Sequence, residues 1–152
     1  MTLELINTGS ELLLGQILNT HLPYLAQKLA ELGLSIQRQT TVPDGQLIRE
    51  AIEESLVRAE IILITGGLGP TSDDLTRDIV AEIVGQKLLM HQPTLDAIEK
   101  RYSKRKLPLP DLVKTQARAR KSGSLSERNG NRARFLFTLS RETSFYSSWP
   151  SF

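Results

Sequence analysis

The sequence of 152 residues contains no cysteine, which excludes disulfides, thiolate metal sites and cysteine nucleophiles. Only two histidines are present, His21 and His91, and neither has a partner at metal-ligand spacing, so we expect both to be structural or solvated. No apolar run approaches the roughly 20 residues that cross a membrane. The N-terminus lacks the basic and apolar regions of a secretory signal, so we expect a cytoplasmic protein.

The small net charge of +2 hides an asymmetry along the chain. Residues 1–113 hold 11 basic and 15 acidic residues, whereas residues 114–152 hold 8 basic and 2 acidic residues. Such a change indicates two parts of different character. We predict one domain over residues 1–115 and a divergent, truncated or poorly ordered tail over residues 116–152, in which only "FLFTL" at Phe135–Leu139 has strand character.

The first part alternates between strand and helix patterns. Short apolar or β-branched runs at residues 3–8, 34–41 and 61–64 are typical of strands. Leucines at positions 18, 22, 25, 29 and 32 predict a helix that ends at Gly33, and further apolar stripes predict helices over 47–56, 75–84 and 95–102. This order predicts a three-layer α/β/α sandwich with a mostly parallel sheet, whose ligands bind beyond the carboxyl ends of the strands.

The stretch "TGGLGPTSDDLT" at Thr65–Thr76 follows the third predicted strand directly. Glycines at positions 66, 67 and 69 allow a backbone that approaches a ligand closely, and main-chain N–H groups there form an anion cradle with the next helix. The spacing fits neither a dinucleotide fingerprint nor a P-loop. A tight strand-to-helix turn also explains many of these glycines.

Aspartates accompany this turn and the loop before the second helix. Asp73 and Asp74 follow the glycines, and Asp44 lies in "VPDGQLI". Each could cap the helix that follows it. Alternatively, carboxylates from two loops meet at one edge and hold Mg²⁺, which also carries the substrate's phosphates, so that the negative charges no longer oppose one another.

Three motifs in this order resemble the N-terminal domain of the competence/damage-inducible CinA family, within the wider molybdopterin-binding superfamily. They are "TGSELLLGQILNTH" at Thr8–His21, "TVPDGQLI" at Thr41–Ile48 and "TGGLGPTSDDLTRD" at Thr65–Asp78. The resemblance covers about residues 1–115. It implies the molybdopterin-binding type of α/β fold and divalent-metal-dependent pyrophosphatase activity on ADP-ribose and related nucleoside diphosphates.

The resemblance also implies roles for individual residues. Asp44 and Asp74 match the functional acids of the adenylyltransferase branch and are the predicted catalytic pair. The predicted metal ligands are Asp44, Asp73, Asp74 and Glu11. The predicted phosphate or substrate contacts are Gly66, Gly67, Gly69, Thr71, Thr76, Gly9 and Ser10.

Two departures from the family pattern favour alternatives to this activity. The chain has no room for the amidase domain of full-length CinA proteins, so we expect no amidase activity. A Gly-Thr-Ala-Pro-Gly-like loop is replaced by "NGNRARFLFTL" at Asn129–Leu139. The alternatives are an adenylyltransferase-like protein of molybdenum cofactor biosynthesis, a molybdopterin- or nucleotide-binding module, or an inactive remnant. We expect a small nucleotide or pterin ligand, self-association into a homo-oligomer, no membrane partner and, at most, weak nucleic-acid binding through the basic tail.

Overall fold

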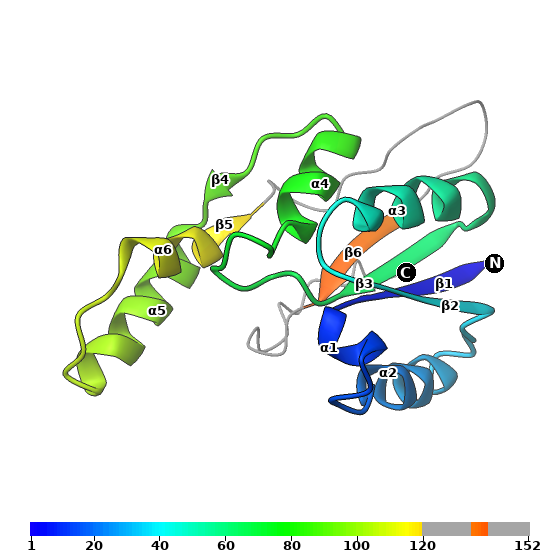
Figure 1. Cartoon of the computed structure of the whole chain (residues 1–152), viewed down its shortest axis with the longest axis horizontal. Coiled ribbons are helices and arrows are strands. Elements are labelled where there is room, and N and C mark those ends of the chain that lie inside the picture. The colour runs from blue at the N-terminus through cyan, green and yellow to red at the C-terminus, as the bar shows by residue number, and fades with distance from the viewer. Residues whose placement is uncertain (120–134, 140–152) are drawn as a thin grey trace.

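The computed structural model describes residues 1–119 and the backbone of residues 135–139. Its main sheet has four parallel strands in the order β2-β1-β3-β6 (Figure 1). The strands are β1 (Leu3–Thr8), β2 (Arg38–Val42), β3 (Ile61–Thr65) and β6 (Phe135–Leu139). A second, antiparallel sheet joins β4 (Leu89–Met90) to β5 (Arg118–Ala119). The predicted parallel sheet is confirmed.

Six α-helices and a 3₁₀ turn accompany the strands in the part of the chain that the structure describes. They are α1 (Ser10–Leu13), α2 (His21–Ala30), α3 (Leu47–Arg58), α4 (Thr76–Ile83), α5 (Gln92–Lys104), α6 (Asp111–Lys114) and η1 (Thr115–Ala117). Helix α2 covers one face of the main sheet, and α3 and α4 cover the other (Figure 1). The predicted three layers are therefore present.

The two faces of the sheet bury two separate apolar clusters, because successive strand side chains point to opposite faces. Ile6, Ile62 and Ile64 pack with α3 and α4. On the opposite face, Leu5 and Leu63 pack with α2. Strands β1 and β3 are covered on both sides, which accounts for their nearly continuous apolar sequences.

Two predicted boundaries differ from the structure. Helix α2 begins at His21, and Leu18 before it is 87% exposed. The side-chain oxygen of Asn19 accepts hydrogen bonds from the N–H groups of His21 and Leu22, which fixes the start of the helix there. Strand β2 begins at Arg38 rather than at residue 34, because the preceding apolar residues pack against the α2 side of the sheet as a connecting segment.

The last strand of the main sheet comes from the predicted tail. Residues Phe135–Leu139 pair with β3 over their whole length, with Phe137 opposite Leu63. The strand character predicted for "FLFTL" is therefore confirmed, residues 116–119 of the predicted tail belong to η1 and β5, and residues 120–134 and 140–152 lie outside the described residues. Among the helices that the structure describes, none has the length and apolar character needed to cross a membrane.

A second feature is an arm, defined here as residues 89–119, that carries β4, α5, α6, η1 and β5. In Figure 1 it extends away from the main sheet on the side of the carboxyl ends of the strands. The N–H of His91 donates to the carbonyl of Ala117 at 2.8 Å, which closes the base of the arm beside the β4–β5 pair. The arm therefore borders the edge at which a parallel sheet binds ligands.

Candidate functional site

The first two loops at the carboxyl edge of the sheet are joined by Asp44. Its Oδ2 accepts a hydrogen bond from the N–H of Ser10 at 3.0 Å and another from the Ser10 hydroxyl at 3.3 Å. The N–H of Gly9 donates to the carbonyl of Val42 at 3.1 Å. Asp44 makes no capping hydrogen bond to α3, which begins after Gln46. The capping interpretation of Asp44 was therefore wrong, and this aspartate connects two loops.

Glu11 belongs to the same pair of loops. Its carboxylate folds back over Gly9, so that a Cβ built at Gly9 would lie 2.7 Å from Oε1. Ser10, Glu11 and Asp44 thus lie together at the ends of β1 and β2, as the resemblance implies for this edge of the sheet.

The glycine turn after β3 packs its main chain tightly against neighbouring groups. Gly66 has φ +94°, and a Cβ there would lie 2.1 Å from the carbonyl oxygen of Thr8. Gly67 has φ +60°, and a Cβ there would lie 2.1 Å from Oγ1 of Thr76. Both the dihedral angle and the lack of space therefore require glycine at these two positions.

Asp74 holds this turn from within. One carboxylate oxygen accepts the N–H of Gly69 at 2.8 Å, and the other accepts the N–H of Thr71 at 2.9 Å and also the Thr71 hydroxyl. Helix α4 begins after Leu75 without a side-chain cap. The capping interpretation was therefore wrong for Asp74 too, since its carboxylate is an anion bound by the turn's own amides.

Asp73 differs from its neighbour in environment. Its side chain is exposed, and hydrogen bonding from Thr71, followed by its own backbone N–H, lowers its pKa. The Thr71 hydroxyl also donates a hydrogen bond to Oδ2 of Asp74. The two carboxylates therefore compete for one hydroxyl, and Asp73 faces solvent in its ionised form at neutral pH.

The amides that Asp74 does not use are the donors that remain for a ligand. Within residues 1–119, the N–H groups of Gly66, Gly67 and Leu68 donate to no acceptor, and Gly67 is buried. The hydroxyls of Thr8 and Thr76 beside this turn are buried too, and neither has a hydrogen-bond partner in the described part of the chain. Buried donors without acceptors are rare in proteins and often indicate a site completed by an ion, a ligand or water.

A network of side-chain amides is centred on the buried Asn7, next to this edge of the sheet. It was not predicted from the sequence. Asn7 in β1 donates to Oγ1 of Thr65 in β3 at 2.6 Å and accepts from Asn19 at 3.0 Å and Gln39 at 2.9 Å. It therefore connects three strands and the start of α2. An asparagine inside an otherwise apolar strand was the signal that could have revealed it.

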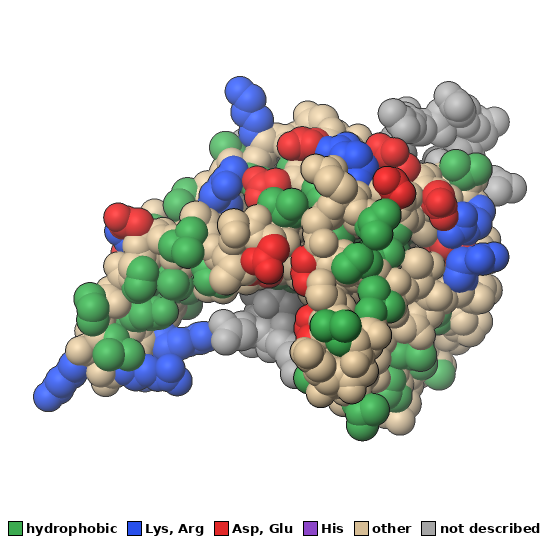
Figure 2. Space-filling model, viewed as in Figure 1, with side chains coloured by type: hydrophobic (Ala, Val, Ile, Leu, Met, Phe, Trp, Pro, Cys, Tyr) green, Lys and Arg blue, Asp and Glu red, His purple; other side chains and the backbone are tan. Residues whose placement is uncertain are grey.

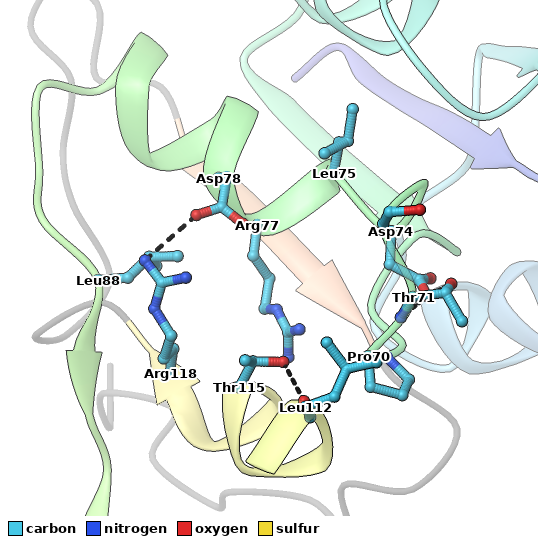
Figure 3. A pocket seen from close by; sticks show the side chains of 11 residues that line it. Pro70, Thr71, Asp74, Leu75, Arg77, Asp78, Leu88, Leu112, Thr115 and Arg118 are labelled. Carbon is cyan, nitrogen blue, oxygen red and sulfur yellow. Dashed lines mark hydrogen bonds and ion pairs between the residues drawn. The ribbon is translucent and has the colours of Figure 1, made fainter. Parts of the chain in front are cut away.

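On the other side of the glycine turn, a hollow of about 210 Å³ separates the turn from the arm (Figure 3). Its lining includes Thr71 and Asp74 of the turn and Thr115 and Arg118 of the arm, but none of the residues Gly9, Ser10 or Asp44. The predicted site residues therefore fall into two groups, with Gly9, Ser10, Glu11 and Asp44 at the joined loops and Thr71 and Asp74 at the hollow.

Arg77 joins the glycine turn to the arm. Its guanidinium donates to the carbonyl of Gly69 at 3.0 Å and to the carbonyl of Gln116 at 3.1 Å. In Figure 3 its side chain runs from α4 toward the α6–η1 segment. Burial lowers the pKa of Arg77, and the charges of Asp78 and Asp74 oppose this shift only in part. An ion pair between Arg118 and Asp78 at 3.3 Å adds a second connection.

The acids do not form a preassembled metal cage. Within the described residues, no group of three or more His, Cys, Asp or Glu side chains is placed to hold a metal ion. Asp44 is the best single candidate, because Oδ1 accepts no hydrogen bond from the described residues while Oδ2 is fixed by Ser10. Carboxylate oxygens suit Mg²⁺, which binds through one or two carboxylates together with phosphate and water.

Comparison with known proteins gives consistent results. A family model described as "Probable molybdopterin binding domain" matches residues 4–140. A CinA-like protein of Kosmotoga olearia is 51% identical over 100 residues, which cover 65% of this chain and 24% of that protein. A CinA-like protein of Dictyoglomus thermophilum is 43% identical over 112 residues, covering 73% of this chain and 27% of that protein. The chain thus spans about a quarter of the length of these relatives.

Solved structures show the same fold. The protein CinA from Thermoplasma acidophilum superposes with a TM-score of 0.71 at 24% identity, covering 91% of this chain and 88% of that one. A molybdenum cofactor biosynthesis protein from Corynebacterium diphtheriae gives a TM-score of 0.62 at 18% identity, covering 91% of this chain and 80% of that one.

Proposed function

Because the chain belongs to the molybdopterin-binding domain family and its CinA-like branch, we propose that it binds a phosphorylated pterin or nucleotide at the carboxyl edge of its sheet. The phosphate would lie on the main-chain N–H groups of the glycine turn. The joined loops that carry Ser10 and Asp44 would border the ligand on one side, and the arm would border it on the other.

The observation that carries this proposal is the row of donors at Gly66, Gly67 and Leu68, which have no acceptor within residues 1–119. Consecutive N–H groups in a turn of this kind form a concave anion site. Asp74 already satisfies the next amides along the turn, at Gly69 and Thr71. The Asp74 carboxylate therefore fixes the shape of the turn. The three neighbouring N–H groups have no acceptor among residues 1–119 and are available to a ligand.

The test is substitution of Gly67 by alanine, with Gly85→Ala as a matched control. Both glycines have similar positive dihedral angles, φ +60° at Gly67 and φ +65° at Gly85, so both variants carry the same backbone strain. Only at Gly67 does the added Cβ meet another group, because Gly85 has open space within 4 Å. We expect Gly67→Ala to weaken pyrophosphate binding at least tenfold by calorimetry, and Gly85→Ala to leave it within about twofold.

The proposal fails if the unaltered chain binds neither pyrophosphate nor a nucleoside or pterin diphosphate. It also fails if both alanine variants lose affinity equally, since the loss would then follow from backbone strain alone. Thermal unfolding of the two variants gives the stability against which each binding result is judged.

A second candidate function is metal-dependent hydrolysis of an ADP-ribose-like diphosphate, which the free Oδ1 of Asp44 favours. Asp44 and Glu11 would hold a divalent cation such as Mg²⁺ together with the ligand's phosphates. When bound, the cation would neutralise phosphate charge and lower the pKa of a bound water. Ser10 would fix the orientation of the Asp44 carboxylate.

Hydrolysis of ADP-ribose with Mg²⁺, and again with a chelator, tests this second function. We expect turnover to require the cation and Asp44→Asn to reduce it at least a hundredfold, while pyrophosphate binding without metal changes little. Turnover that survives the chelator would exclude the metal-dependent reaction. Adenylyl transfer is separated from hydrolysis by supplying ATP with molybdopterin and looking for the adenylylated product.

A further inference from the structure

The arm presents an apolar face that the rest of the protein covers only in part. Helix α5 has no fully buried residue, yet Leu95, Ile98 and Tyr102 recur at helical spacing and are each half-buried. Ile98 and Tyr102 line one hollow together with Val113 and Gln116 of the α6–η1 segment, which packs against α5. Among the residues that the structure describes, α5 packs mainly against this short segment, and its apolar residues are half-buried.

Between α5 and the α6–η1 segment lies an arm hollow of about 260 Å³, and its lining residues are Pro70, Ile98, Arg101, Tyr102, Arg105, Leu107, Val113 and Gln116. Pro70 also lines the hollow beside Asp74 and follows directly on Gly69 of the glycine turn. The arm hollow therefore begins where the phosphate-binding turn ends. A ligand with its phosphate on the turn could reach the hollow with the group on the other side of that phosphate.

The arm also supplies the positive charge that the rest of the described protein lacks. Residues 1–99 contain 14 acidic and 6 basic residues, whereas residues 100–106 contain five basic residues and no acidic one. Figure 2 shows Lys and Arg side chains gathered at the tip of the arm and along its side toward the body. An anionic ligand whose phosphate lies on the glycine turn would meet its counter-charge on the arm.

The chemistry of the arm hollow selects a planar heteroaromatic ring. The lining combines the aliphatic residues Ile98, Leu107 and Val113 with the half-buried aromatic Tyr102 and the exposed Arg105. Aromatic side chains and arginine both stack on the flat faces of nucleobases. The volume is that of a single ring system rather than of a whole dinucleotide.

We propose that the arm hollow binds the heteroaromatic ring of the ligand whose phosphate lies on the glycine turn, with the ring against Tyr102 and under Arg105. This proposal rests on the phosphate-binding function proposed above. An adenine ring and a pterin ring share the required chemistry, and the choice between them is left to the ligands used in the test.

The test compares ligands with and without the ring in the full chain. ADP and 6-hydroxymethylpterin diphosphate carry the two kinds of ring, and pyrophosphate carries none. We expect Tyr102→Ala to weaken binding of the preferred ring-bearing ligand about tenfold and to leave pyrophosphate affinity within twofold. Tyr102→Phe keeps the ring and should bind like the unaltered chain. The ligand that binds more tightly to the unaltered chain identifies the ring.

Arg105→Gln gives an independent measurement, because this exposed side chain can be changed without disturbing the packing of α5. Lys104→Gln is its matched control, since Lys104 is the adjacent exposed cation but does not line the arm hollow. We expect Arg105→Gln to weaken the ring-bearing ligand at least threefold more than Lys104→Gln does.

The outcomes separate this inference from the proposal on which it rests. If the unaltered chain binds none of the three ligands, the phosphate-binding function fails, and this inference with it. If pyrophosphate binds but the ring adds no affinity, or if Tyr102→Ala weakens pyrophosphate as much as ADP, the phosphate site stands and the ring site is excluded. If Tyr102→Ala does not fold, the comparison between Arg105→Gln and Lys104→Gln decides the question alone.

Discussion

At the residue scale, the carboxylate of Asp74 is used to bind the amides of its own turn. Its carboxylate accepts the N–H groups of Gly69 and Thr71 and the Thr71 hydroxyl, and a Cβ on Gly69 would lie 2.4 Å from one of its oxygens. An ionised carboxylate binds N–H donors more strongly than a neutral acceptor does. A loss of activity on changing Asp74 would therefore report the shape of the turn as well as any role in metal binding or catalysis.

This arrangement predicts different stability effects at two adjacent aspartates. We expect Asp74→Ala to lower the free energy of unfolding by about 1–3 kcal/mol, because the amides of Gly69 and Thr71 lose their acceptor. We expect Asp73→Ala to change it by less than about 0.5 kcal/mol, since that side chain is exposed. Urea denaturation of both variants measures the difference. Equal stability would mean that Asp74 does not hold the turn.

The sequence predicted the presence of these carboxylates at the sheet edge but not their contacts. Asp44 and Asp74 both precede helices, so capping was one of two interpretations of each. In the structure, Asp44 binds Ser10, which is 34 positions earlier in the chain, and Asp74 binds amides behind it in the same turn. Only the folded positions of the loops determine these partners. The expected roles of Asp44, Asp73, Asp74 and Glu11 in metal binding stay predictions.

At the scale of elements, the sequence predicted best the strands that are buried on both faces of the sheet. β1 and β3 were predicted within one residue of their observed bounds, because apolar runs covered on both faces leave a clear pattern. The arm was not predicted as a unit. The apolar stripe of α5 was predicted as a helix over 95–102, but strands β4 and β5 have only two residues each, so no periodic signal identifies them.

Arg77 connects two such elements, and its removal should loosen one of them selectively. We expect Arg77→Ala to lower the free energy of unfolding by about 1–2 kcal/mol, because the carbonyls of Gly69 and Gln116 lose a charged donor. Amide hydrogen exchange should rise in the arm and the glycine turn more than in β1 and β3.

A surface arginine on α3 provides the control for Arg77. Arg49 pairs with Glu53 and Glu82, whose side chains are 53% and 66% exposed, so Arg49→Ala should cost less than about 0.5 kcal/mol. If Arg77→Ala accelerates exchange no more than Arg49→Ala does, the arm is held by its own contacts and Arg77 does not couple it to the turn.

At the scale of the whole molecule, apolar clusters lie on both faces of the sheet, whereas acidic and basic residues are concentrated in different parts of the chain. Each face of the sheet buries an apolar cluster, with nine buried residues on the α3–α4 side and four on the α2 side, and the order of strands and helices in the sequence predicted these layers. Figure 2 shows Lys and Arg side chains gathered at the arm tip and acidic side chains on the body, a separation in space that a count along the chain does not give. The charge change near residue 114 indicated two parts, yet Phe135–Leu139 completes the sheet of the first part.

The position of β6 has a consequence for the newly made protein as it leaves the ribosome. Strands β1, β2 and β3 end by Thr65, whereas their neighbour β6 starts only at Phe135, 70 positions later. At about 5–20 residues per second, synthesis of that stretch takes about 4–14 s. During this interval β3 offers one unpaired edge of "IILIT" to any other extended chain. Recruitment of a chaperone to the nascent chain would be most useful in those seconds, and a slow codon between the two strands would prolong the exposure.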